Sequence, residues 1–253
     1  MYNFFKKLNR KRKANRTLES IQKNFIHPLK DDLRESHTIY SNNNLNNEIS
    51  KLCELHDSDK GYIDYNLATP NHDFKPHNYA NYYLDLFDAF KNEVKLVFEC
   101  GVGTYDLNIR NNMVNRGTKP GASLRMWKDY FKNAYIFGAD IDKKILFNEE
   151  RISTFYVNQL EKDSIISMWN KVDKKNFDII IDDGLHTLDA AVTLFENSFF
   201  QLKKNGIYII EDVHFLYLNN LVKKLIRFNP QVITMAHRED KKDNNLIVFR
   251  KRN

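Results

Sequence analysis

Residues 177–186 read FDIIIDDGLH, an apolar run followed directly by two aspartates, a glycine and a histidine. An apolar run of this length, bounded by turn-forming residues, predicts a strand that is buried on both faces. Two carboxylates left side by side at its end would repel one another and raise each other's pKa. The stretch therefore predicts a central strand whose carboxyl end carries a polar site.

From residue 94 onward, short apolar runs alternate with helical patterns. Strands separated by helices imply right-handed crossovers and a parallel sheet covered on both faces. We expect Ser123 to cap the first helix of this region. The expected strands are VKLVFEC (94–100), AYIFGAD (134–140), STFYVN (153–158), FDIIID (177–182) and GIYIIED (206–212), and the expected helices are SLRMWKDYFK (123–132), KDSIISMWNKV (162–172) and LDAAVTLFENSFFQLKK (188–204). The last runs, QVITMAHRED (231–240) and NNLIVFR (244–250), predict an antiparallel hairpin at one edge.

The segment before the sheet divides into an arm and a helical lead-in. Residues 1–40 show no sustained period and predict a flexible or loosely helical arm, whereas NNLNNEISKLCELHD (43–57) predicts a short helix. The spacing of Tyr79, Tyr82, Tyr83, Leu86, Phe87 and Phe90 predicts the apolar face of an amphipathic helix. We therefore expect a basic arm over residues 1–49 and a domain over residues 50–253 that includes the lead-in.

Composition and charge narrow the class of protein. The chain has 253 residues, of which 42% are hydrophobic and 28% charged, as in ordinary globular proteins. No apolar run approaches the roughly 20 residues that cross a bilayer, and the N-terminus lacks the apolar core of a secretory signal, so we expect no membrane span and a cytoplasmic location. Two cysteines argue against a thiolate metal site. The net charge of +6 lies largely in KKLNRKRK (6–13) and RKRN (250–253), so no specific nucleic-acid partner is expected.

Polar residues follow each predicted parallel strand, at the sheet edge where doubly wound folds bind ligands. They are Glu99 to Gly103, Asp140, Asn158, Asp182 to His186, and Glu211 to His214. Gly101 and Gly103 would let a ligand approach the backbone, and Asp140 is placed to accept both hydroxyls of a ribose. Leu107 stands where a pyrophosphate-binding helix would begin, which argues for a nucleoside without a diphosphate.

Several motifs in order, FECGVGTYD, PGASLRMWKDYF, IFGADID, FYVNQ, FDIIIDDGLH and GIYIIEDVH, resemble those of the class I methyltransferases that use S-adenosylmethionine. The resemblance is narrower to the metal-dependent O-methyltransferases of sugar hydroxyls, such as macrolide deoxysugar enzymes and bacterial capsule-sugar enzymes. It covers residues 57–214 and includes SDKG (58–61) and HNYANYY (77–83). It implies an α/β fold with a Rossmann-like doubly wound sheet, mostly parallel, with the antiparallel edge hairpin at the C-terminus.

The resemblance also implies roles for individual residues. Asp183, Glu211 and Asp212 match carboxylates that bind a divalent cation. His186 matches the proposed general base, so that His186 and Asp183 would be the catalytic residues. The residues that would bind S-adenosylmethionine are Glu99, Gly101 and Gly103 at its methionine part, Ser123 near it, Asp140 at the ribose, Asn158 and Gln159 beside the adenine, and Asp182 on the cofactor side of the turn; Asn158 stands where the family has an acid.

The chemistry of the residues agrees with these roles. A sugar hydroxyl is a poor nucleophile at neutral pH, so a cation beside the oxygen and a base with a near-neutral pKa would both help. Three carboxylates suit Mg²⁺ or Mn²⁺, and with Fe²⁺ we would expect His186 to join the ligands. The structural alternative is that DDGLH is a capped strand-to-helix turn and IIED an ordinary strand end. Their coincidence on neighbouring strands favours the site.

The sequence therefore predicts an S-adenosylmethionine-dependent, divalent-metal-assisted O-methyltransferase that acts on a sugar hydroxyl. Its acceptor would be a small-molecule sugar, nucleotide-linked or part of a surface polysaccharide (capsule) or other glycan precursor. The alternatives are an RNA or DNA methyltransferase, suggested by the charge, and a non-catalytic S-adenosylmethionine-binding protein. The long connection TYDLNIRNNMVNRGTKPGA (104–122) predicts a lid or a contact within a homo-oligomer, and we favour the lid.

Overall fold

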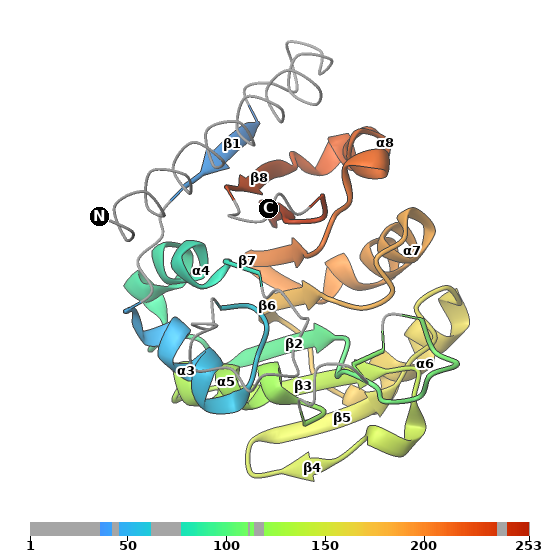
Figure 1. Ribbon diagram of the computed structural model, residues 1–253. Helices are drawn as coiled ribbons and strands as arrows, with labels where there is room; N and C mark the ends of the chain where they lie inside the picture. The colour runs from blue at the N-terminus through green and yellow to red at the C-terminus, as the bar shows by residue number, and fades with distance from the viewer. Residues whose placement is uncertain are drawn as a thin grey trace.

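In the computed structural model a nine-stranded sheet lies between two layers of helices (Figure 1). The structure describes residues 36–41, 46–61, 77–110, 112–113, 119–236 and 242–252. The strands are β1 (His37–Tyr40), β2 (Leu96–Cys100), β3 (Tyr135–Asp140), β4 (Asn148–Glu149), β5 (Ile152–Tyr156), β6 (Phe177–Asp182), β7 (Leu202–Ile210), β8 (Gln231–Met235) and β9 (Asn245–Arg250). The helices are α3 (Glu48–His56), α4 (Ala80–Phe87), α5 (Ala122–Tyr130), α6 (Lys162–Val172), α7 (Leu188–Ser198) and α8 (Phe215–Leu225), with short 3₁₀ turns η2 (Asp88–Phe90), η3 (Lys143–Ile145), η4 (Phe199–Gln201) and η5 (Ile226–Phe228).

The strand order β1-β8-β9-β7-β6-β2-β3-β5-β4 reverses its direction of growth between β2 and β6. The chain winds outward from β2 through β3 to β5, returns to β6 beside β2, and then winds the other way to β7, with all these pairs parallel. The expected doubly wound, mostly parallel sheet is confirmed. Its point of reversal is where such folds bind ligands.

The C-terminal hairpin is confirmed as well, because β9 pairs antiparallel with both β7 and β8. The hairpin is not the outermost element, however, since β1 pairs in parallel with β8 beyond it. Residues 37–40, which the sequence assigned to the arm, are therefore an edge strand of the sheet. Residues 1–35 of the arm lie outside the described residues.

Two local expectations at helix ends are wrong. Helix α5 begins after Gly121, whose φ of 79° supplies the left-handed turn, and Ser123 is already inside the helix. The hydroxyl of Ser123 donates to Glu99 instead of capping the helix. Helix α7 ends at Ser198, and Leu202–Lys204 already belong to β7, because the chain must turn back to pair with β6.

The core has two halves, one on each face of the sheet. Along β6, which is buried at every position, Phe177 and Ile180 pack with the half beneath α6, α7 and α8. Ile179 and Ile181 pack with the half beneath α3, α4 and α5. From Ile179 to Ile181 the side chains face the two halves in turn, after a register shift between Phe177 and Ile179. The opening apolar run is therefore confirmed as a central strand buried on both sides.

None of the described helices is long and apolar enough to cross a membrane.

The prediction of a lid over 104–122 falls partly on residues 111 and 114–118, which lie outside the described part of the chain.

Candidate active site

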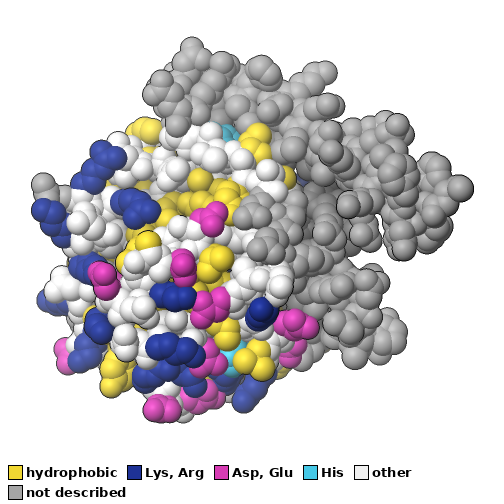
Figure 2. Space-filling view, turned by 90° about the vertical axis from the view of Figure 1, so that its left-hand side faces the viewer, with side chains coloured by type: hydrophobic (Ala, Val, Ile, Leu, Met, Phe, Trp, Pro, Cys, Tyr) yellow, Lys and Arg dark blue, Asp and Glu magenta, His cyan; other side chains and the backbone are white. Residues whose placement is uncertain are grey.

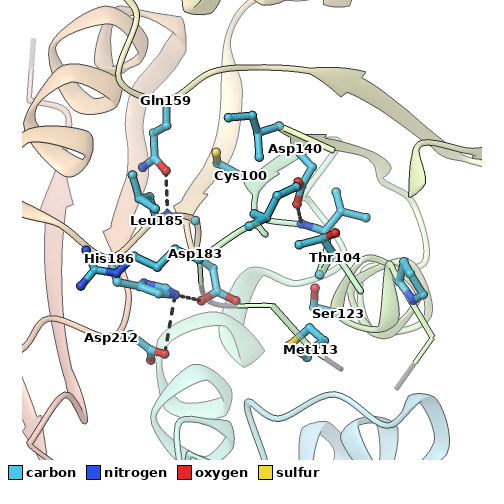
Figure 3. A pocket seen from close by; sticks show the side chains of 18 of the residues that line it. Cys100, Thr104, Met113, Ser123, Asp140, Gln159, Asp183, Leu185, His186 and Asp212 are labelled. Atoms are coloured by element: carbon cyan, nitrogen blue, oxygen red, sulfur yellow. Dashed lines mark hydrogen bonds and ion pairs between the residues drawn. The ribbon is translucent and has the colours of Figure 1, made fainter. Parts of the chain in front are cut away.

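A cavity of about 280 Å³ lies at the carboxyl ends of the parallel strands, where the strand order reverses (Figure 3). It brings together most of the residues that the sequence singled out. Those that line it are Gly101, Gly103, Ser123, Asp140, Asn158, Gln159, Asp183, His186 and Asp212. Glu99, Asp182 and Glu211 are buried residues that do not line the cavity.

The glycine turn after β2 is required by the chain itself. Gly101 and Gly103 have φ values of 101° and 89°, which favour glycine. A Cβ on Gly101 would lie 2.0 Å from the carbonyl oxygen of Asp183, so only glycine allows the turn after β2 to contact the turn after β6. This contact positions the two turns that form the middle of the cavity.

Asp140 lies at the end of β3 and faces the cavity. Its Oδ2 accepts from the backbone N–H of Val102 at 2.8 Å, and its Oδ1 accepts from that of Asp142 at 2.9 Å. Burial raises the pKa of Asp140. The neighbouring helix cap is Asp142, whose side chain accepts from Lys144. Asp142, and not Asp140, therefore caps this helix, and Asp140 lines the cavity.

Gln159 connects the turn after β5 to the turn after β6. Its amide nitrogen donates to Asp182 at 2.5 Å, and its oxygen accepts from the backbone N–H of Leu185 at 2.9 Å. Burial raises the pKa of Asp182 to about 6. Asn158 uses its side-chain oxygen to accept from Leu160, which shapes the same turn. Gln159 thus supports one wall of the cavity while lining it.

Glu99 at the end of β2 is fully buried behind the cavity wall. The Ser123 hydroxyl donates to its Oε1 at 2.5 Å, and the Trp127 indole N–H donates to its Oε2 at 2.5 Å. Ser123 itself lines the cavity. Glu99 is therefore linked to the ligand space through Ser123.

Asp183, His186 and Asp212 meet at one side of the cavity (Figure 3). Nε2 of His186 lies 3.7 Å from Oδ1 of Asp183 and 3.9 Å from Oδ2 of Asp212. The three potential ligand atoms all lie within 4.8 Å of one another. His186 and Asp212 both have a φ of 52°, in the left-handed region of the backbone. Residues other than glycine adopt this conformation at a cost in free energy, and they do so often at functional sites.

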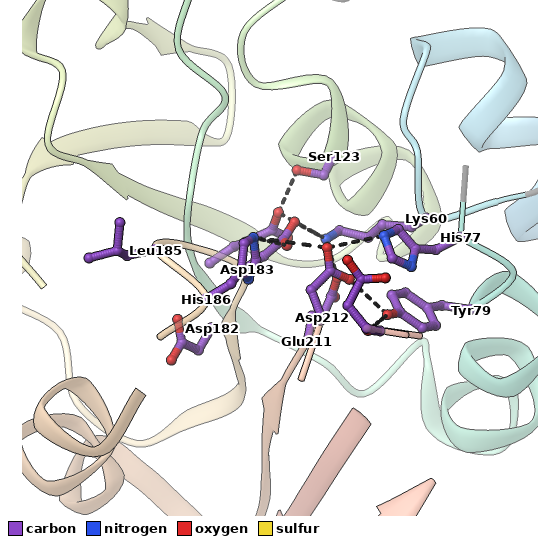
Figure 4. Close-up of polar contacts among 12 residues, drawn as sticks. Lys60, His77, Tyr79, Ser123, Asp182, Asp183, Leu185, His186, Glu211 and Asp212 are labelled. Atoms are coloured by element: carbon purple, nitrogen blue, oxygen red, sulfur yellow. Dashed lines mark hydrogen bonds and ion pairs between the residues drawn. The ribbon is translucent and has the colours of Figure 1, made fainter. Parts of the chain in front are cut away.

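Four residues of the lead-in contact Glu211 or Asp212, and sequence reasoning gave them no primary role; three of them, Lys60, His77 and Tyr79, can be seen in Figure 4. His77 and the Tyr79 hydroxyl contact Asp212 at 3.0 and 2.7 Å. Lys60 and the Tyr83 hydroxyl contact Glu211 at 2.7 and 2.5 Å. The sequence held two signals of these contacts. The predicted apolar helix face carries tyrosines and not only phenylalanines, and the SDKG motif contains a lysine.

The carboxylate of Asp212 is stabilised in its charged form. Burial alone would raise its pKa, but the charge and hydrogen bond of His77, the charge of His186 and the Tyr79 hydroxyl outweigh burial and hold the pKa of Asp212 below its usual value. A charged carboxylate with oxygen and nitrogen neighbours suits a hard divalent cation.

The doubly wound sheet, with β9 antiparallel between β7 and β8, has the arrangement of the class I methyltransferase fold. No family model matches the chain. It is 33% identical over 141 residues, 56% of this chain and 34% of the relative, to the 8-demethyl-8-alpha-L-rhamnosyl tetracenomycin-C 2'-O-methyltransferase of Streptomyces olivaceus. It is 33% identical over 165 residues, 65% of this chain and 38% of the relative, to the mycinamicin VI 2''-O-methyltransferase of Micromonospora griseorubida.

A solved structure supports the same fold. The MycE methyltransferase of the mycinamycin biosynthetic pathway, in complex with Mg and SAH, matches 69% of this chain and 39% of its own with a TM-score of 0.53 and 26% identity. The resemblance to sugar O-methyltransferases is therefore confirmed. The chain spans about a third of the length of the curated relatives it matches.

Proposed function

We propose that this protein transfers a methyl group from S-adenosylmethionine to a hydroxyl of a sugar, assisted by a divalent cation. The observation that carries the proposal is the convergence of Asp183, His186 and Asp212 in the cavity that also holds Asp140 (Figure 3). One side of the cavity suits a nucleoside, and the other suits a cation and a hydroxyl.

The donor would bind along the turns after β2, β3 and β5. Asp140 would accept the ribose hydroxyls, and Gln159 and Asn158 would lie beside the adenine. Because the Ser123 hydroxyl donates to Glu99, its oxygen remains able to accept from the ammonium of the methionine part. S-adenosylmethionine supplies the methyl group on a positively charged sulfur.

The cation would be held by Asp183 and Asp212. Mg²⁺ is commonly bound by one or two carboxylates while it keeps several waters, so two aspartates at the rim of a cavity fit it, and Mn²⁺ accepts similar ligands. The structure of the similar MycE methyltransferase contains Mg and SAH, which supports a divalent cation in this reaction. A bound cation would supply positive charge beside the acceptor oxygen as its proton leaves.

His186 would take the proton from the acceptor hydroxyl. The oxygen forms a bond to the methyl carbon while the carbon–sulfur bond breaks, and the electron pair of that bond stays on sulfur as S-adenosylhomocysteine. Nε2 of His186 lies 3.7 Å from Oδ1 of Asp183 and 3.9 Å from Oδ2 of Asp212, so the proposed base would lie beside the proposed cation site.

The acceptor class rests on the sugar O-methyltransferases to which the chain is similar. Neither of those two relatives is named for capsule or other polysaccharide synthesis, so a surface polysaccharide precursor is the narrower part of the proposal.

On the face shown in Figure 2, basic and acidic side chains are interspersed, so the described residues there present no continuous basic surface for a nucleic acid.

The test is a transfer assay with purified protein, S-adenosylmethionine, Mg²⁺ or Mn²⁺, and a panel of glycosides and nucleotide-linked sugars, read by mass spectrometry of the O-methyl product. We expect His186→Ala and Asp183→Ala each to lower the rate at least about 100-fold, as loss of acid–base catalysis does. Full activity in both variants would disprove the mechanism. Donor binding without transfer to any sugar would favour a binding protein, and salt-sensitive methylation of RNA or DNA would favour the nucleic-acid alternative.

A further inference from the structure

Lys60 is a buried ammonium surrounded by carboxylates from three strand ends (Figure 4). Its side chain is 1% exposed. Its Nζ lies 2.5 Å from Oδ2 of Asp183, 2.7 Å from Oε2 of Glu211 and 3.5 Å from Oε1 of Glu99. Lysine is almost never fully buried unless it is paired, so these contacts hold the side chain in place.

The carboxylate of Glu211 is fully engaged by the protein. Lys60 occupies its Oε2, and the Tyr83 hydroxyl donates to its Oε1 at 2.5 Å. The residue is 2% exposed and does not line the cavity. Glu211 was one of the three carboxylates that the sequence assigned to the cation, yet it presents neither oxygen to the cavity.

The carboxylate of Asp183 is divided between two neighbours. Its Oδ2 is held by Lys60, while its Oδ1 points toward Nε2 of His186. Asp212, which follows Glu211 directly, turns its Oδ2 to the same imidazole. Adjacent residues on one strand end therefore have different surroundings: Glu211 is bound to Lys60 and Tyr83 away from the cavity, whereas Asp212, in contact with His77 and Tyr79, lines the cavity.

We propose that Lys60 divides the acidic cluster into a lysine-held part and a cation-binding part. It keeps Glu211 away from the cation and fixes Asp183 so that one oxygen remains for it, which leaves Asp183 and Asp212 as the protein carboxylates of the centre. The inference rests on the proposed function, because it concerns the cation of that reaction. Lys60 does not line the cavity, so it acts as a positioning residue.

The ammonium of Lys60 offsets part of the negative charge that Glu99, Asp183 and Glu211 bring together. Without the ammonium, Glu211 would be a buried carboxylate with an unpaired charge, and a cation would be the nearest group to pair with it.

The test measures Mn²⁺ binding by the full chain, stripped of metal with a chelator, from the electron paramagnetic resonance signal of free Mn²⁺. We expect Asp212→Asn to weaken binding by at least about tenfold, since even partners outside the ligand shell have effects of that size. Glu211→Gln should weaken Mn²⁺ binding less than Asp212→Asn does, because Glu211 is held by Lys60 and Tyr83 and does not line the cavity. Thermal unfolding of each variant shows that it is folded.

Removing the ammonium should change the role of Glu211. In Lys60→Met we expect Mn²⁺ to bind more tightly, and in the double variant Lys60→Met/Glu211→Gln we expect that gain to disappear. Lys91→Met is the matched control, because Lys91 also pairs with two carboxylates, Glu48 and Asp88, that do not line the cavity. If Lys60→Met does not fold, the comparison of Glu211→Gln with Asp212→Asn decides alone.

Three results would overturn the inference. Glu211→Gln that weakens Mn²⁺ as much as Asp212→Asn would show that Glu211 is a ligand, and the proposed function would stand. Unchanged affinity in a folded Lys60→Met would show that Lys60 withholds nothing, again without touching the function. No Mn²⁺ binding by the unsubstituted protein would remove the metal-assisted function and this inference together.

Discussion

Nε2 of His77 lies 3.0 Å from Oδ2 of Asp212, the same oxygen that faces His186. The other ring nitrogen of His77 lies 2.8 Å from the side-chain oxygen of Asn244. The lead-in before α4 is thus joined to the carboxyl end of β7 and to the start of β9. Because both ring nitrogens are engaged, His77 fixes the direction in which Asp212 presents its oxygens.

We therefore predict that His77→Gln weakens divalent-cation binding by about 10- to 100-fold, the usual effect of losing a partner that orients a ligand. Calorimetry with Mg²⁺ measures it. His214→Asn is the control, because His214 caps α8 through its contact with Leu216, does not line the cavity, and asparagine is a good cap. Equal affinities in the two variants would contradict the prediction.

Asp140→Asn should weaken binding of S-adenosylhomocysteine. The amide has one accepting oxygen where the carboxylate has two, so one hydrogen bond from the ribose to a charged acceptor would be lost. Such a bond contributes about 1.5–3 kcal/mol, which corresponds to a roughly 10- to 100-fold lower affinity for S-adenosylhomocysteine. Asp178→Asn provides the comparison. Asp178 is also buried and accepts from two backbone N–H groups, those of Lys95 and Leu96, but at the opposite end of the sheet. It should lose stability and keep its affinity.

Gly101→Ala should be much more harmful than Gly103→Ala. Both positions have a positive φ, which costs an ordinary residue about 1–2 kcal/mol. At Gly101 the new Cβ would also lie 2.0 Å from a backbone oxygen, whereas at Gly103 the nearest atom is 3.2 Å away in the flexible side chain of Met113. Urea unfolding of the two variants compares the costs. Similar free energies of unfolding would show that the turns after β2 and β6 are not in tight contact.

Most of the fold followed from the sequence because its strands are short apolar runs bounded by polar turns. The pattern gave β6 and its neighbours and the hairpin of β8 and β9. The pattern did not predict β1, because His37–Tyr40 is too short and too polar to show a period. The strand forms by pairing with β8, which lies almost 200 residues further along the chain.

The candidate site was predictable where its residues follow strands, as Asp140, Asp183, His186 and Asp212 do. Lys60 lies far from these residues in sequence, and nothing local shows that its charge is buried. The helical spacing of Tyr79 and Tyr83 predicted that their rings pack in the core. It did not predict which residues their hydroxyl groups contact. Such residues are defined by tertiary contacts between the lead-in and the sheet.

His37 on β1 offers a pH-dependent contact away from the cavity. Its Nε2 lies 2.7 Å from the Thr234 hydroxyl, which in turn donates to Asn245, so Nε2 carries the proton of the neutral ring. Its Nδ1 is buried and has no hydrogen-bond partner among the residues that the structure describes. Protonation would place an N–H there without an acceptor, and burial accordingly lowers the pKa of His37 to about 4.

Between pH 6.5 and 4 the unfolded chain binds a proton at His37 more readily than the folded chain does. The contribution of neutral His37 to the free energy of unfolding should therefore be complete above the unfolded-state pKa of about 6.5 and should be lost as the pH falls from there toward 4. The loss is at most about 3 kcal/mol. We expect His37→Gln, which keeps an amide donor for Thr234, to lack this loss, so the difference between the unfolding free energies of the two proteins should shrink over that range. The protection factors of the amides of residues 37–40, which correct for the pH dependence of intrinsic exchange, should fall on acidification only when His37 is present. A difference between the two proteins that does not vary with pH would show that the ring is not buried in its neutral form.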